Sequence, residues 1–215
     1  MKNLLTISDV FIIESLPTED PHDGKLLFDV LKMMGKNPIY RKVKDADDFE
    51  NALNDYKQSK YRFLHISCHG NKSQVFFEEG MVDYLGFGNL FANHSLPVTR
   101  IFFSACCLGN LALSKAIITA NKAVHSIVAP TQKIPFDLAL IAWSSFYVKA
   151  FGWNKDGISE NTILMTMRQI ANLFLLDFDV SSLHTDNMKI YSFPIIPEKH
   201  ILQKARKPII IPMES

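Results

Sequence analysis

The sequence predicts a single α/β domain in which helices cover both faces of a mostly parallel central sheet. Short apolar runs alternate with amphipathic segments of helical spacing, as expected for strand–helix–strand units in a parallel sheet. The 215 residues fit one domain. Their composition, 47% hydrophobic and 21% charged, is that of an ordered globular chain. No internal repeat or linker divides the sequence, so we expect one domain over residues 1–215.

The first predicted elements alternate between strand and helix. The apolar run Val10–Leu16 predicts a buried strand, and the polar stretch Pro17–Gly24 predicts a loop. A helix is expected to begin near Asp23, where negative charge favours a helix start. Pro38–Val43 predicts a second strand. Asp45–Tyr56 predicts a second helix because its apolar residues fall on one stripe.

The middle of the chain contains two further core strands. Tyr61–Cys68 is rich in β-forming residues and predicts the third strand. Val75–Phe77 and Met81–Leu85 flank a glycine-containing turn and predict a small hairpin. A short helix is expected at Asn89–His94. The apolar run Arg100–Cys106 predicts the fourth core strand.

The remaining elements complete the alternation. Leu108–Ala120 predicts a helix and His125–Ala129 a fifth strand. A helix is expected over 135–151, with a proline in its first turn. Ser159 is a candidate cap for another helix. The segment 152–215 is thus expected to hold this helix and an extended tail, with a strand near Lys189–Phe193.

Charge and cysteine content exclude several classes of protein. The chain has 23 Lys and Arg against 22 Asp and Glu, so no basic excess indicates a nucleic-acid partner. Cys68, Cys106 and Cys107 are too few for a disulfide framework and indicate thiols in a reducing compartment. No apolar run is long enough for a transmembrane helix. We therefore expect a cytoplasmic protein that acts away from membranes.

Two predicted strand ends contain residues suited to nucleophilic catalysis. The third strand ends in the run Ser67–Gly70, which includes His69, and the fourth ends in Ser104-Ala105-Cys106. If the two strands are neighbours in a parallel sheet, both ends lie on one edge and His69 faces Cys106. A free thiol has a pKa of about 8.5, so it needs a base to become a nucleophile at neutral pH. An imidazole supplies that base and later protonates the leaving amine.

Other interpretations of these residues remain open. Cys106 alone is more often a small buried core residue. Cys107 is an alternative nucleophile, although successive strand residues point to opposite faces and only one of the pair faces the site. A zinc site built from Cys68, His69, Cys106 and Cys107 is disfavoured because adjacent residues on strands diverge.

The order His69-Gly70 followed by Ser104-Ala105-Cys106, each after an apolar strand, resembles the signature of caspase-like cysteine peptidases. The form is most similar to the CHAT branch (caspase HetF associated with TPRs), which shares features with separase. Residues 128–151 resemble the CHAT segment in which a strand leads to an aspartate, matched by Asp137, and then to a helix carrying a Phe-Tyr pair. Lys133 stands where that family commonly has Trp. The resemblance covers about residues 10–151.

The resemblance implies a caspase-like three-layer sandwich and a cysteine endopeptidase without metal or organic cofactor. It implies that Cys106 is the nucleophile, that His69 is the general base and acid, and that the Gly70 and Cys106 amides form the oxyanion hole. Asp137, Ser104 and Ser67 are candidate substrate-binding residues. For Asp137 the alternative is a role at the start of its helix.

Biological context also comes from the resemblance. It implies a specific protein substrate, an activating or regulatory protein partner, and a function in bacterial defence or regulated cell death. The alternative function is a catalytically inactive caspase-fold module that binds a protein partner. Intact His69 and Cys106 argue against this alternative, because an inactive copy has no chemical need for both.

Overall fold

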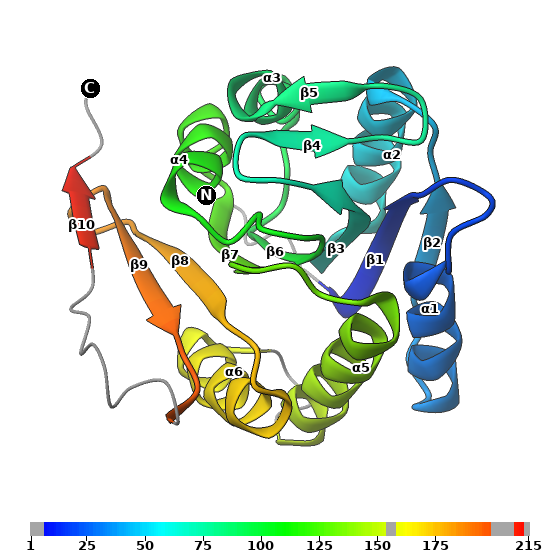
Figure 1. The fold of residues 1–215 in the computed structure, drawn as a ribbon. Coiled ribbons are helices and arrows are strands. Elements are labelled where there is room, and N and C mark those ends of the chain that lie inside the picture. Colours follow the sequence, from blue (N-terminus) through cyan, green and yellow to red (C-terminus); the bar gives the residue numbers. More distant parts are fainter. Residues whose placement is uncertain (1–6, 154–157, 199–208, 213–215) are drawn as a thin grey trace.

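A computed structural model describes residues 7–153, 158–198 and 209–212, so parts of the expected C-terminal tail lie outside the described residues. It confirms the α/β architecture with a mostly parallel central sheet and helices on both faces (Figure 1). The strand order is β10-β9-β8-β7-β6-β3-β1-β2. Within the described residues, no helix is long and apolar enough to cross a membrane.

The parallel half of the sheet comprises five strands. They are β1 (Ile7–Ser15), β2 (Ile39–Lys42), β3 (Tyr61–Gly70), β6 (Thr99–Ser104) and β7 (Val124–Pro130). β1, β3 and β6 are central and read as near-continuous apolar runs because both of their faces are covered. Along β1, Phe11 and Ile13 pack on one face while Val10 and Ile12 pack on the other.

The antiparallel part of the sheet follows β7. It comprises β8 (Phe178–His184), β9 (Lys189–Ile195) and β10 (Ile209–Pro212). The expected strand near Lys189–Phe193 is therefore confirmed, whereas β8 and β10 were not predicted. A small hairpin, β4 (Gln74–Phe76) and β5 (Met81–Asp83), pairs with the end of β3.

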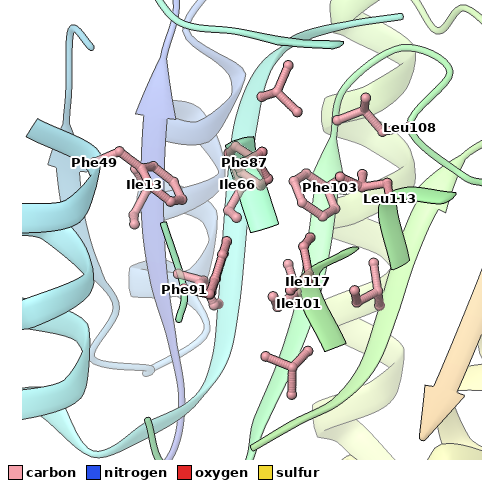
Figure 2. Packing of buried hydrophobic residues seen from close by; sticks show 14 of the residues in the cluster. Ile13, Phe49, Ile66, Phe87, Phe91, Ile101, Phe103, Leu108, Leu113 and Ile117 are labelled. Carbon is pink, nitrogen blue, oxygen red and sulfur yellow. The ribbon is translucent and has the colours of Figure 1, made fainter. Parts of the chain in front are cut away.

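Helices cover both faces of the sheet (Figure 1). On one side lie α2 (Ala46–Ser59), α3 (Tyr84–Asn89) and α4 (Leu111–Ala120). Figure 2 shows their core, in which Phe49, Phe87 and Phe91 pack against strand residues such as Phe103. On the other side lie α1 (Asp23–Met33), α5 (Phe136–Trp153) and α6 (Glu160–Phe174), which bury a second core around Trp143.

One predicted helix was misplaced. The short helix expected at Asn89–His94 is instead α3, at Tyr84–Asn89. It begins earlier because Asp83 caps it: the Gly86 N–H donates to the Asp83 carboxylate at 2.7 Å. The hairpin strand expected at Met81–Leu85 is correspondingly shorter and ends at Asp83.

Candidate functional site

The pairing register brings the two reactive strand ends together. β3 and β6 are parallel neighbours, and Ser67 lies opposite Ser104 at the last paired position. His69 and Cys106 each follow two residues later, so both lie at the carboxyl edge of the sheet, where parallel α/β proteins bind ligands. Both side chains line one hollow of about 60 Å³. Its walls are formed by Cys68, His69, Ser104, Ala105, Cys106, Ile134, Phe136 and Ala139.

Of the three cysteines, Cys106 is placed for chemistry. Cys68 is 3% exposed, and burial raises the pKa of its thiol far above the ordinary value. Cys107 has a left-handed backbone with φ of 61°, and its amide donates to the Gln132 carbonyl at 3.1 Å. The chain therefore turns at Cys107, and Cys107 is not among the residues that line the hollow.

The Cys106 thiol contacts the main chain of Ile134, which lies between β7 and α5. The Ile134 N–H donates to Cys106 Sγ at 3.5 Å, and Sγ donates to the Ile134 carbonyl at 3.7 Å. The Ile134 side chain is anchored in the core and is 8% exposed. Ile134 thus contacts the half-buried thiol through its main chain.

Gly70 lies directly over the turn that contains Cys106. A Cβ at Gly70 would stand 2.6 Å from Leu108 Cδ2 and 3.1 Å from the Cys106 carbonyl oxygen, so no larger residue fits without a shift. The neighbouring Asn71 N–H donates to the Gln74 carbonyl across the hairpin at 3.0 Å. Because N–H groups alternate in direction along an antiparallel pair, the Gly70 N–H points away from β4.

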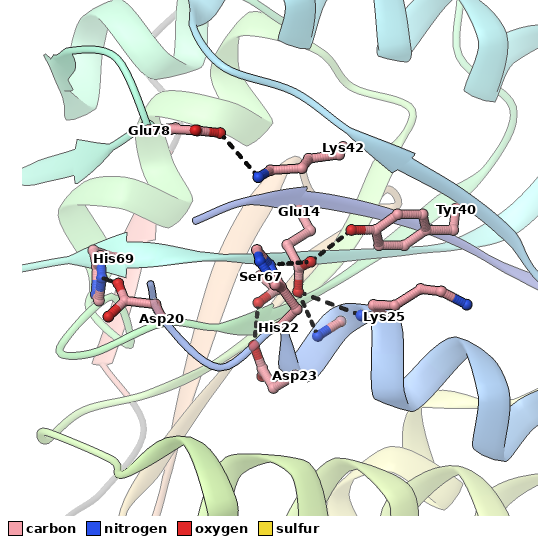
Figure 3. Close-up of polar contacts among 11 residues, drawn as sticks. Glu14, Asp20, His22, Asp23, Lys25, Tyr40, Lys42, Ser67, His69 and Glu78 are labelled. Atoms are coloured by element: carbon pink, nitrogen blue, oxygen red, sulfur yellow. Dashed lines mark hydrogen bonds and ion pairs between the residues drawn. The ribbon is translucent and has the colours of Figure 1, made fainter. Parts of the chain in front are cut away.

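The two predicted substrate-binding serines bind a buried carboxylate instead. Ser67 and Ser104 both donate short hydrogen bonds to Asp23, the first residue of α1 (Figure 3 shows Ser67 and Asp23). Ser104 still lines the hollow, but Ser67 is fully buried and does not. Burial raises the pKa of Asp23 to about 6, against the opposing effect of the serine hydrogen bonds.

Asp137 lies apart from the hollow. It is exposed in the first turn of α5, and its carboxylate accepts a hydrogen bond from the Leu138 N–H at 2.8 Å. This placement matches the helix-start alternative, since a negative charge is favourable at a helix N-terminus. Asp137 is not among the residues that line the hollow.

Sequence reasoning missed one polar neighbour of the site. Asp20, in the loop between β1 and α1, places its Oδ2 2.7 Å from His69 Nε2 (Figure 3). The imidazole also packs against the Phe136 ring in a T-shaped arrangement, with ring centroids 5.6 Å apart. The available signal was position: the 17–22 loop follows the carboxyl end of β1, a neighbour of β3, and so reaches the same edge of the sheet.

In the part of the chain that the structure describes, no group of three or more His, Cys, Asp or Glu residues is placed to hold a metal ion.

Comparisons with known proteins add no family assignment. No protein-family model and no curated protein matches the chain. A solved structure of O-acetylhomoserine sulfhydrylase from Wolinella succinogenes is 12% identical and matches 77% of this chain. The match covers 52% of that protein, so the chain spans about half its length, and the TM-score is 0.34. A similarity this low carries no argument about function.

Proposed function

We propose that the chain is a caspase-like cysteine endopeptidase with His69 and Cys106 as its catalytic pair. The observation that carries the proposal is the β3–β6 register, which places both residues at one sheet edge and around one hollow. A thiol with an adjacent imidazole is the arrangement that thiol acyl transfer requires. The SerAlaCys and HisGly motifs support the assignment to the CHAT branch.

In the proposed reaction, His69 accepts the Cys106 proton and the thiolate attacks the scissile carbonyl carbon. A carbon–sulfur bond forms, and the carbonyl π electrons move to the oxygen. The amides of Gly70 and Cys106 stabilise this oxyanion by donating hydrogen bonds. The tetrahedral species collapses, the carbon–nitrogen bond breaks, and His69 protonates the leaving amine. Water, deprotonated by His69, then hydrolyses the thioester and releases a carboxylate and the free thiol.

The proposal includes movement of the 131–135 segment when a substrate binds, because the Ile134 main chain contacts the thiol. This contact supports a requirement for an activating or regulatory protein partner before a specific protein substrate is cut. A cytoplasmic location in a bacterial defence or cell-death pathway is part of the proposal. Three free cysteines are consistent with a reducing compartment.

The second candidate function is an inactive module that binds a protein partner. The observation that favours it is the contact between the Cys106 thiol and the main chain of Ile134. While this contact persists, it competes with a substrate for the thiol. Cys106 reactivity separates the two functions, because a catalytic thiol needs its histidine whereas a buried structural thiol does not.

The experiment is alkylation with iodoacetamide at neutral pH, followed by peptide mapping of all three cysteines. The endopeptidase proposal expects fast labelling of Cys106, slower labelling of Cys107 and none of Cys68. His69→Ala should slow Cys106 labelling by at least tenfold, whereas the matched control His125→Ala, on the distant part of β7, should leave it unchanged. Equal labelling in all variants would favour the binding module.

A further inference from the structure

The contact between Asp20 and His69 restricts which imidazole nitrogen can act as a base. Asp20 Oδ2 lies 2.7 Å from His69 Nε2, within normal hydrogen-bond range. An ionised carboxylate only accepts hydrogen bonds, so the proton of the neutral imidazole must lie on Nε2. The unprotonated nitrogen is then Nδ1, which is the atom left to accept a proton from Cys106.

The loop that carries Asp20 is held in place by hydrogen bonds of two buried carboxylates, Glu14 before it and Asp23 after it in the chain. Glu14 of β1 is fully buried and accepts hydrogen bonds from the Gly24 N–H at 2.7 Å and the Tyr40 hydroxyl at 2.6 Å (Figure 3). The His22 ring lies 3.0 Å from the same carboxylate. These bonds fasten the loop that carries Asp20 to β1 and β2.

The C-terminal end of this loop is also hydrogen-bonded to β3, which contains His69, and to β6, which precedes Cys106. The carboxylate of Asp23 accepts hydrogen bonds from Ser67 on β3 and Ser104 on β6. Asp20 therefore sits on a loop whose far end is fixed to the same strands that position His69 and Cys106. A loop fixed in this way holds the carboxylate against His69 without a large entropic cost when the substrate binds.

We infer that Asp20 is a positioning residue for His69, so that Cys106, His69 and Asp20 form a catalytic triad. This inference rests on the proposed function. Asp20 sets the tautomer of the ring before reaction and faces the imidazolium that forms when His69 takes the Cys106 proton. Phe136 from α5 packs against the His69 ring, and Cys106 shares the hollow with it. The described residues that line the hollow include no Asp or Glu. Asp20 is thus the anionic partner of the ring.

The test compares Asp20→Asn with the matched control Glu19→Gln. Glu19 is the adjacent residue and is exposed, so its variant removes the same charge from the same loop without touching His69. The first measurement is the rate of Cys106 alkylation by iodoacetamide between pH 5 and 9. The second is the ring ¹⁵N chemical shifts of His69, which report the tautomer directly. Urea unfolding of each variant checks that the fold is retained.

For Asp20→Asn we expect alkylation of Cys106 at pH 6.5 to slow by about fivefold, the size of a partly screened ion pair. The pH profile should move to lower pH, because loss of the negative charge favours the neutral imidazole over the imidazolium. The ¹⁵N shifts should show loss of the pure Nε2–H tautomer. Asp20→Glu should restore part of the rate. Glu19→Gln should match the wild type in every measurement. A profile and ¹⁵N shifts that are the same in Asp20→Asn and the wild type would overturn the inference.

These measurements need no substrate, so they separate the inference from the proposed function. If Asp20→Asn shifts the profile and the tautomer while wild-type protein cuts no peptide bond, the positioning function stands and the endopeptidase proposal fails. If the wild type and Asp20→Asn cut peptides at equal rates over the whole pH range, the reaction needs only Cys106 and His69. The inference about Asp20 then fails, while the endopeptidase proposal stands.

Discussion

Replacing Asp23 with Asn should change how the stability of the protein depends on pH. Asp23 is 3% exposed, and burial raises the pKa of its carboxyl from 3.8 to about 6. The difference between these two pKa values corresponds to about 3 kcal/mol of free energy of unfolding. The folded protein therefore holds this proton more tightly than the unfolded chain does.

The sign of the effect follows from proton binding. Below about pH 4 the carboxyl is protonated in both states, so Asp23 carries no ionisation penalty. Between about pH 4 and pH 6 the unfolded chain releases the proton first, and the free energy of unfolding falls as the pH rises. Above about pH 6 the penalty stays constant near 3 kcal/mol. Asn has nearly the same shape and no charge to bury, so it removes this dependence.

The assay is urea unfolding of wild type and Asp23→Asn at several pH values from 4 to 8. Relative to the wild type, the variant should gain about 3 kcal/mol between pH 4 and pH 7. Asp29→Asn is the control on the same helix, because the Asp29 side chain is 55% exposed. A difference between wild type and Asp23→Asn that does not change with pH would refute the reasoning.

Two further predictions concern the residues around Cys106. Gly70→Ala places a methyl group 2.6 Å from Leu108 and should shift the turn that contains Cys106. We expect the free energy of unfolding, measured in urea, to fall by about 1–3 kcal/mol. Peptide cleavage should be about a hundredfold slower, because the Gly70 amide that donates to the oxyanion moves. Cleavage within tenfold of the wild type would contradict this. Ile134→Ala removes the core anchor of the 131–135 segment, so it should cost about 2 kcal/mol of stability yet speed Cys106 alkylation severalfold. Slower alkylation in this variant would show that Ile134 does not restrict access to the thiol.

The proximity of His69 and Cys106 could be predicted from the sequence because it depends on a simple rule of parallel sheets. Apolar runs locate β3 and β6, and the carboxyl ends of neighbouring parallel strands meet at one edge. His69 lies at the end of β3 and Cys106 lies two residues after β6, so their positions do not depend on the conformation of a long loop. By contrast, Asp20 lies in an irregular loop, whose course depends on tertiary hydrogen bonds such as those of Glu14 and Asp23.

Strand β8 was missed because its core is partly polar. Phe178–His184 contains Asp179, Ser181 and Ser182, which do not form an apolar run. The Ser181 hydroxyl donates to the Asp179 carboxylate at 2.7 Å, and a serine of β9 donates to the same carboxylate. Buried polar groups are tolerated in a strand when hydrogen bonds satisfy them, and the partner from β9 is not visible in the local sequence.

Helix α3 shows a conflict between local preference and packing. It contains Gly86 and Gly88, each of which is unfavourable in a helix. A Cβ at Gly88 would lie 2.8 Å from the backbone of Ala116 in α4, so the glycine permits the two helices to approach closely. That tertiary contact outweighs the weak local preference, which explains why the helix was expected later in the chain.

The central claim is that Cys106 cleaves peptide bonds, and the most direct measurement compares wild type with Cys106→Ala. Each protein is incubated with a proteome-derived peptide library and with candidate partner proteins encoded nearby, and new termini are identified by mass spectrometry. The account predicts a set of termini that appear with wild type and vanish in both Cys106→Ala and His69→Ala. Termini that persist in Cys106→Ala would contradict it. The absence of cleavage by both the wild type and the Ile134→Ala variant would also contradict it.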